Sequence, residues 1–263
     1  MLGLNSFSAA QIQTFLLIFV RTTAIITLLP IFGTRDVPAR LKVGLSAFLS
    51  ILLVQYTGVE TGAFAGGFTI PGFMVLVLRE VFIGLTIGYA SSLLFAAVQF
   101  AGRLIDTQMG FAMVQLVDPF TDTRTTVAGQ VQVIVYSLVF LVLNCHYFMI
   151  LAIQKSFELI PLLGAEFASG GIAQYMTDLT GAIFVTAIRL AAPVFAVLVL
   201  ASLSLGIIAR TVPQINIFFV GLPMKIMLGL STLAVAFPVM AKVFRGMVDT
   251  LVKDIWNLLY IMA

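Results

Sequence analysis

Charged residues are scarce in this chain, and one long stretch has none. Asp, Glu, Lys and Arg make up 10% of the 263 residues and hydrophobic residues 61%, whereas soluble domains are about 25% charged. None of the four occurs between Thr125 and Gln154. As a helix this stretch would be about 45 Å long, and the hydrocarbon core of a bilayer is about 30 Å thick. The shortage of charge excludes an ordinary soluble domain and indicates a chain embedded in lipid or buried in a large assembly.

Residues that perform chemistry are equally rare. Cys145 is the only cysteine, which excludes an intrachain disulfide, and His146 is the only histidine. The sequence contains no HExxH, GxSxG or GxxxxGKS/T motif. Asp106, Asp118 and Asp122 are close together but lack the spacing of a calcium-binding loop. We therefore expect no catalytic site, no metal and no cofactor, so that the chain is not an enzyme.

The charges that are present do not form a basic patch. Fourteen Lys and Arg against 11 Asp and Glu give a net charge of +3, spread along the chain. Nucleic-acid binding needs clustered basic residues on a soluble fold, so we expect no nucleic-acid partner. No polar block, Pro/Ser-rich linker or charge run divides the sequence. Residues 1–263 are therefore expected to form a single integral membrane domain.

Apolar segments make up most of the sequence. They predict an all-α polytopic membrane protein with about six long helices, near Ile12–Phe32, Val43–Tyr56, Pro71–Ala101, Val127–Ile153, Thr177–Leu205 and Ile217–Met240. A mixed helix with a polar face, suited to an interface, is expected from Lys242 to Ala263. Pro30, Pro193 and Pro238 lie inside or at the ends of these segments, where we expect kinked or broken helices.

The distribution of basic residues does not fit six simple membrane spans. The loop after the first segment holds Arg35, Arg40 and Lys42, so the positive-inside rule places it in the cytoplasm. With six spans the C-terminal tail would then lie outside, although it also carries Lys and Arg. The second segment is short for a span, and the third and fifth are long. Either the tail is an exception or the segments are not six simple spans.

Small residues recur at helical spacing in the third segment. Gly84 and Gly88 form a GxxxG pair, and Ala97 and Ala101 repeat the small-xxx-small pattern. This spacing lets helix backbones approach closely in an apolar medium, so we predict helix packing there. Chance is the alternative, since both residue types are common in membrane helices.

Charged residues inside the apolar segments need an explanation, and we single out Arg21, Arg79, Glu80 and Arg189. A charge at mid-bilayer is unfavourable by at least about 2.5–3.5 kcal/mol, so each of them needs a partner, water or a protein environment. Arg21 and Arg189 could line a polar pathway or a subunit contact. They could equally form structural ion pairs or reach the membrane interface. Arg79 and Glu80 point about 100° apart on a helix, so we expect each to find its partner elsewhere.

The stretch from Gly102 to Gly129 is unusual because it is apolar but unsuited to a helix. Asp118-Pro119 opposes helix formation, and an apolar non-helical segment at membrane depth must be buried in protein or line a cavity. Flexible methionines can seal around variable shapes. We predict a pore plug or gate, with a simple re-entrant packing loop as the alternative. The candidate residues are Met109, Gly110, Phe111, Met113, Leu116, Val117, Asp118, Pro119 and Phe120.

A second special stretch runs from Gly206 to Lys225. It contains a polar turn, and Gly221 and Pro223 are expected to break the start of the sixth segment. A broken helix with exposed backbone groups suits a subunit contact or polar pathway, and a tight loop fits as well. The polar-turn candidates are Arg210, Pro213, Gln214 and Asn216.

Several pieces of sequence, in order along nearly the whole chain, resemble the FliR family of flagellar export-gate subunits. They are FGTRDVPARLKVGL, LREVFIGLTIGYA, FAAVQFAGRLIDTQMGF followed by VDP, NCH, and RTVPQINIFFVGLP. No single piece is decisive, but the combination is specific. The related T subunits of virulence type III secretion systems are the second branch, and the flagellar branch is favoured.

The resemblance implies a subunit that joins FliP-like and FliQ-like subunits in a pore for unfolded flagellar proteins. It implies a P-like part over about residues 1–205, a Q-like part over about 206–263, and a plug-forming loop at Gly110–Thr126. Further implied partners are FlhB-like and FlhA-like export components, basal-body ring and rod proteins, and membrane lipid. The implied location is the flagellar basal body in the bacterial inner membrane. A polytopic secondary transporter or channel for a small solute is the alternative function.

Overall fold

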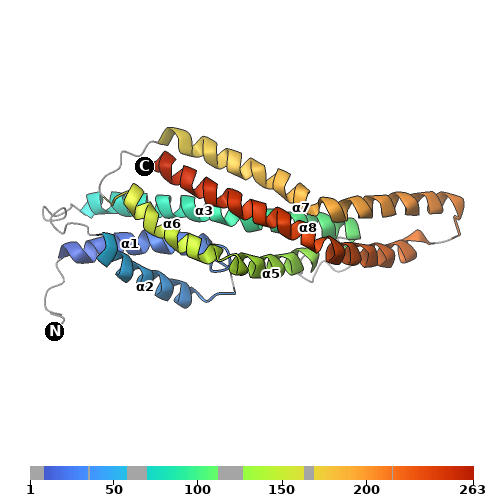
Figure 1. Ribbon diagram of the computed structural model, residues 1–263, viewed down its shortest axis with the longest axis horizontal. Coiled ribbons are helices and arrows are strands. Elements are labelled where there is room, and N and C mark those ends of the chain that lie inside the picture. The colour runs from blue at the N-terminus through green and yellow to red at the C-terminus, as the bar shows by residue number, and fades with distance from the viewer. Residues whose placement is uncertain (1–8, 35, 58–69, 112–126, 163–168, 215) are drawn as a thin grey trace. The chain divides into compact units, whose positions relative to one another are not determined.

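The computed structural model describes residues 9–34, 36–57, 70–111, 127–162, 169–214 and 216–263, which are helices and the turns that join them (Figure 1). These ranges contain no β-strand, which confirms the all-α class. The helices are α1 (Ala9–Leu28), α2 (Ala39–Thr57), α3 (Ile70–Met109), α5 (Val127–Val142), α6 (Cys145–Leu159), α7 (Ser169–Thr211) and α8 (Ile217–Met262).

Three helices are much longer than a membrane span requires. α3, α7 and α8 contain 40, 43 and 46 residues, which corresponds to about 60–70 Å at about 1.5 Å per residue. The predicted third and fifth segments are therefore parts of longer helices, α3 and α7. The hydrocarbon core of a bilayer is about 30 Å thick, so these helices exceed it about twofold.

The expected separation of the sixth segment from a C-terminal helix is wrong. α8 runs without interruption through Gly221, Pro223 and Pro238 to Met262, so the predicted break at its start is wrong as well. α7 likewise continues through Pro193. A proline removes one backbone donor, but neighbouring helices and local adjustment can compensate in an apolar setting.

The charge-free stretch, in contrast, forms two helices where one was predicted. α5 and α6 meet at an angle of 69° across Leu143 and Asn144. Asn144 has φ 55° and ψ 26°, the left-handed conformation that Asn adopts more readily than most residues. Hydropathy does not reveal this break, because the sequence remains apolar on both sides of a single polar residue.

Four helical stretches are long and apolar enough to cross a membrane: Gln11–Leu28, Ile70–Met109, Gly171–Thr211 and Phe219–Met262. The bent pair α5–α6 qualifies as a fifth if the two helices together make one span. The chain is thus a polytopic helical membrane protein.

The chain divides into two compact units. Unit 1 comprises Met1–Ser92, Asn144–Asp178 and Leu251–Ala263, and unit 2 comprises Leu93–Leu143 and Leu179–Thr250. In unit 1, α1 packs against α2. The core of unit 2 contains an aromatic cluster in which the rings of Tyr136 and Phe244 stack with centroids 4.5 Å apart and Phe95 meets Phe140 and Phe244 edge to face.

Candidate functional site: a buried ion pair and the root of the 112–126 segment

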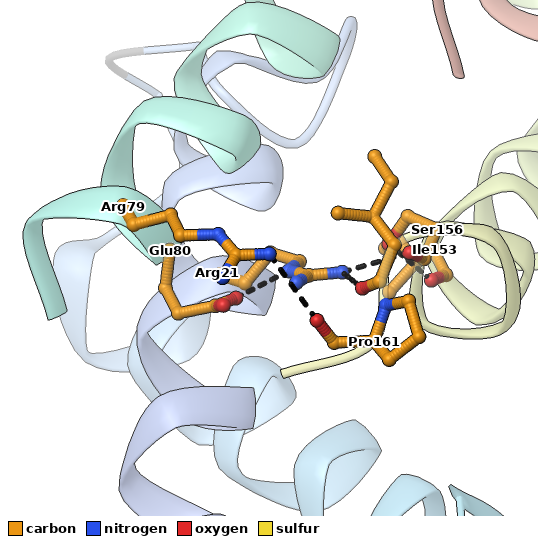
Figure 2. A network of polar contacts seen from close by, with 7 residues as sticks. Arg21, Arg79, Glu80, Ile153, Ser156 and Pro161 are labelled. Atoms are coloured by element: carbon orange, nitrogen blue, oxygen red, sulfur yellow. Dashed lines mark hydrogen bonds and ion pairs between the residues drawn. The ribbon is translucent and has the colours of Figure 1, made fainter. Parts of the chain in front are cut away.

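A fully buried ion pair lies in unit 1. Arg21 of α1 and Glu80 of α3 both have no exposed side-chain surface, and the Arg21 Nε donates a hydrogen bond to Glu80 Oε2. Figure 2 shows Arg21 between Glu80 and Ser156. Of the two interpretations of Arg21 from sequence, this placement agrees with a structural ion pair. It also provides the separate partner expected for Glu80.

The same guanidinium group caps the C-terminal end of helix α6. Its Nη1 donates to the backbone oxygens of Ser156 at 2.8 Å and Ile160 at 3.0 Å. The last carbonyls of a helix have no intrahelical partner and carry partial negative charge, so a cation there is favourable. The ring of Phe157 adds a cation–π contact, with its centroid 4.2 Å from the guanidinium carbon. Arg21 therefore connects three helices that are far apart in the sequence.

Arg79 contacts the same connection one residue further on. Its Nη2 donates to the Pro161 backbone oxygen at 3.3 Å (Figure 2). Two arginines from different helices thus hold the chain just after α6. Among the described residues, Arg21 Nη2, Arg79 Nε and Glu80 Oε1 have no hydrogen-bond partner although they are buried.

The glycine pair of the third segment faces α1. A Cβ on Gly84 would lie 2.7 Å from both the Ala24 Cβ and the Arg21 backbone oxygen, and one on Gly88 would lie 2.8 Å from the Leu28 Cβ. Both distances are too short for real carbon contacts, so only glycine fits without a shift of the backbone. Ala97 and Ala101, further along α3, are buried in unit 2.

The other candidates for a polar pathway or subunit contact stay at the surface of this chain. Arg189 on α7 is exposed and has no partner among the described residues, and Arg210 is exposed in the last turn of α7. Pro213, Gln214 and Asn216 are exposed between α7 and α8. The Asn216 backbone oxygen accepts from the N–H groups of Phe219 and Val220 and so begins α8.

The predicted gate begins at the end of α3. Met109 is the buried last residue of that helix, Gly110 has φ +91°, and Phe111 is half-buried. The N–H groups of Gly110 and Phe111 both bond the Asp106 backbone oxygen at 3.1 Å, a common way to end a helix with a left-handed glycine. The other gate candidates lie outside the described residues: Met113, Leu116, Val117, Asp118, Pro119 and Phe120.

Asp106 joins the two helices that flank this segment. Its carboxylate lies on α3 in unit 2, is 3% exposed, and accepts hydrogen bonds from the N–H groups of Ala128 at 3.0 Å and Gly129 at 3.4 Å. Those N–H groups belong to the first turn of α5. A carboxylate is favourable at this end because the free N–H groups carry partial positive charge. We call this arrangement the loop root.

Close packing reinforces the loop root. A Cβ on Gly102 would overlap the Gly129 Cα and lie 2.8 Å from its nitrogen, so α3 and α5 cross with their backbones in contact. A Cβ on Gly229 of α8 would overlap the Met109 side chain. The end of α3 is therefore fixed against two neighbouring helices of unit 2.

The contacts of Asp106 are not predicted from the sequence, where Asp106 is considered only together with Asp118 and Asp122 and the three are rejected as a calcium-binding loop. The described residues contain no group of three His, Cys, Asp or Glu side chains that could hold a metal ion. The sequence offers one indication that Asp106 needs a hydrogen-bond partner: it is an isolated acidic residue at the end of an apolar helix, four residues before Gly110. Its partners, 22 and 23 residues further on, follow from the fold alone.

Comparison with known proteins identifies relatives over nearly the whole chain. The family described as bacterial export proteins, family 1, matches residues 12–251. The flagellar biosynthetic protein FliR of Bacillus subtilis (strain 168) is 34% identical over 93% of this chain and 94% of its own length. The proteins of that name from Pectobacterium carotovorum subsp. carotovorum and Escherichia coli (strain K12) are 31% and 28% identical, over 90% and 91% of this chain and 90% and 88% of their own lengths.

Proposed function

The chain belongs to family 1 of the bacterial export proteins, and from that premise we propose that it builds, with FliP-like and FliQ-like subunits, the pore through which unfolded flagellar proteins are exported. It is a subunit of the flagellar type III export gate and a membrane-embedded component of the flagellar export apparatus. We place it in the inner membrane, at the basal body. We propose that the chain forms part of the pore wall and closes the pore at rest, and that it catalyses no reaction.

The observation that carries this proposal is the apolar surface of helices that are too long for the bilayer. In α8 the side chains of Phe219, Val235 and Tyr260 are 74%, 82% and 66% exposed. They are distributed over a helix of about 70 Å, and lipid tails can cover only about 30 Å of it. Exposed apolar surface of this extent marks an interaction site. The remainder must be covered by protein, which supports assembly with other apolar helical subunits.

FliP-like and FliQ-like subunits are the proposed cover for this surface. FlhB-like and FlhA-like components, ring and rod proteins and lipid are the proposed outer partners. The exposed polar turn of Pro213, Gln214 and Asn216, with Arg189 and Arg210, provides candidate polar contacts. The division into a P-like part before residue 206 and a Q-like part after it belongs to the same proposal.

We further propose that the segment from Gly110 to Thr126 closes the pore at rest. A pore wide enough for a polypeptide would leak ions unless it were sealed, and the Met and Phe residues of this segment are suited to sealing. The hydrogen bonds of Asp106 support this assignment, because they fix the two helices between which the segment runs. The segment is proposed to move aside for substrates and to catalyse nothing.

Co-purification tests the assembly. When a tagged copy of this chain is expressed with its FliP-like and FliQ-like neighbours, both should co-purify with it as a stable complex. Expressed alone, it should aggregate or be degraded, because its apolar faces lack their cover. A well-behaved isolated chain that binds a small solute would contradict the proposal and favour a transporter.

Deletion of Gly110 to Phe120 tests the gate. The deletion should leave the co-purified complex intact and make it permeable to ions, measured as ion flux per complex in proteoliposomes. Unchanged ion flux from an intact complex would show that this segment does not close the pore.

A further inference from the structure

We propose that a cavity between the end of α1 and the start of α2 binds one anionic phospholipid, with an acyl chain inside the cavity and the phosphate at Arg40. The class of ligand is a membrane phosphodiester with a net negative charge, such as phosphatidylglycerol. The proposal concerns unit 1 alone and requires only that the chain lies in a membrane, so it is independent of the proposed pore and plug.

The cavity is apolar and large enough for part of a lipid. It lies where α1 packs against α2 (Figure 1) and has a volume of about 510 Å³, within the range of about 300–1,000 Å³ that is usual for small-molecule sites. Gly44 of α2 borders it, and a Cβ there would have no atom within 4 Å, so the helix leaves this space unfilled. The apolar residues that line the cavity are Ile26, Ile31, Phe32, Val37, Leu41 and Leu45.

The turn that forms one wall of the cavity is held in a single conformation. The Lys42 Nζ donates hydrogen bonds to the backbone oxygens of Gly33 and Thr34, both at 2.9 Å, and the Gly33 N–H bonds the Leu29 oxygen at 2.7 Å. Ile31 has φ 68°, a left-handed conformation that is unfavourable for a β-branched residue and persists only where the surroundings impose it. These contacts therefore preform this wall of the cavity.

Two basic residues line the same cavity, and one of them is available to an anion. Lys42 is bound to the turn, whereas Arg40 is exposed and has no hydrogen bond or ion pair with any described residue. Asp36, four residues earlier, forms no ion pair with it. The N-terminal end of α2, where Arg40 lies, carries partial positive charge and adds to the attraction for an anion. A guanidinium group at an apolar cavity fits a phosphate that carries an apolar chain.

A phospholipid is the occupant that matches both the lining and the charge. Free phosphate would leave the apolar lining uncovered, and an uncharged lipid or an apolar helix would leave Arg40 without a counter-charge. The positive-inside rule places the connection between α1 and α2 on the cytoplasmic side of the membrane, where the bilayer surface carries anionic lipids. Basic pockets between membrane helices on that side bind anionic head groups.

Photo-cross-linking tests the site on the tagged chain with its co-purified subunits. The protein is reconstituted in phosphatidylcholine vesicles that contain a small amount of one probe, either phosphatidylglycerol or phosphatidylethanolamine, each with a diazirine on one acyl chain. Mass spectrometry then locates the labelled residues. We expect phosphatidylglycerol to label the apolar lining of the cavity with a yield about fivefold above that of phosphatidylethanolamine, the ratio that corresponds to one basic residue acting on an anionic lipid.

Arg40→Gln tests the head-group contact. The substitution should lower labelling by phosphatidylglycerol about fivefold, to the level of phosphatidylethanolamine, and leave labelling by phosphatidylethanolamine unchanged. Arg103→Gln is the matched control, because Arg103 is an exposed arginine on α3 in unit 2; both lipids should label this variant as they label the wild type.

Gly44→Leu tests the cavity without changing any charge. The new side chain enters the unfilled space, so labelling of the lining by both lipids should fall to the background without irradiation. Gly181→Leu on α7 is the matched control, because a Cβ there also has nothing within 4 Å. Both glycines are exposed on helices, so the yield of co-purified complex should stay at the wild-type level in both variants.

Several results would overturn the proposal. Absence of label on the lining in the wild type would show that no lipid enters the cavity, as when a partner subunit covers it. Equal labelling by the two lipids, or wild-type labelling of Arg40→Gln by phosphatidylglycerol, would show that the site does not select an anion. Wild-type labelling of Gly44→Leu would place the lipid on the outer surface of α2. Each result can occur in a complex that co-purifies normally, so failure of the lipid site is distinguishable from failure of the proposed assembly.

Discussion

Replacing Glu80 by glutamine should leave the Arg21 guanidinium buried in unit 1 without a counter-charge. Both side chains are fully buried, so water cannot compensate for the lost carboxylate. Removing one partner of a buried pair is unfavourable by about 3–5 kcal/mol. For a domain of this size, about 1 kcal/mol corresponds to a change of about 2–4 °C in Tm, so we expect Tm to fall by about 6–20 °C.

The reciprocal substitution, Arg21→Met, should be at least as destabilising. It leaves Glu80 charged and removes the hydrogen bonds to the backbone oxygens of Ser156 and Ile160. Ser156 O keeps the N–H of Ile160 at 3.0 Å as a partner, so the carbonyl of Ile160 is the one left without a replacement. The double variant avoids an unpaired charge, and it should lose less stability than the sum of the single variants, by up to about 3 kcal/mol.

Thermal unfolding of the co-expressed, detergent-solubilised complex provides the measurement. Arg245→Met is the control, because Arg245 is exposed on α8 and has no partner among the described residues. Ordinary surface substitutions change the free energy of unfolding by no more than about 0.5 kcal/mol, so the Tm of this variant should stay close to the wild-type value. A Glu80→Gln variant as stable as this control would refute the reasoning. Strict additivity of the two substitutions would refute the coupling between Arg21 and Glu80.

Gly84 and Asn144 occupy positions where the backbone limits which side chains fit. Gly84→Ala should destabilise the complex by about 1–3 kcal/mol, because the new Cβ meets the Ala24 Cβ and the Arg21 backbone oxygen at 2.7 Å. Gly181→Ala on α7 is the control: a Cβ there has nothing within 4 Å, so this substitution should be neutral or stabilising. Equal Tm values for the two variants would contradict the packing argument. Asn144→Val should destabilise by about 1–3 kcal/mol because a β-branched residue is strained at φ 55°, whereas Asn144→Gly should keep the bend; a Tm for Asn144→Val at the wild-type value would show that the left-handed conformation is not needed.

The apolar segments could be predicted from the sequence because segments buried in lipid or protein are locally rich in apolar residues. The all-α class and the positions of the helices follow from this local composition. Their lengths do not, since helices such as α7 continue through residues that sequence rules treat as ends. The rules for Pro and Gly describe helices surrounded by water, where a missing hydrogen bond is not compensated by neighbouring helices.

The contacts of the site could be predicted only in part. The sequence indicates that Arg21, Arg79 and Glu80 need partners, because an isolated charge in an apolar segment is unfavourable wherever it lies. The partners themselves are remote: the Arg21 side chain reaches residues 59, 135 and 139 positions away. The sequence does not predict Asp106 as a helix cap, because its hydrogen bonds depend on how α3 and α5 cross, and no local pattern encodes that crossing.

Both sets of buried contacts have the same physical origin. Arg21, a cation, lies at the C-terminal end of α6, and Asp106, an anion, lies at the N-terminal end of α5. These are the signs that the partial charges of helix ends favour. At a water-exposed helix end, solvent can satisfy the free backbone groups, but at a buried end inside an apolar protein they need a partner from the protein. Arg21 and Asp106, two of the few charges inside the apolar helices, therefore act where a helix ends without water, and one of those ends adjoins the segment proposed to close the pore.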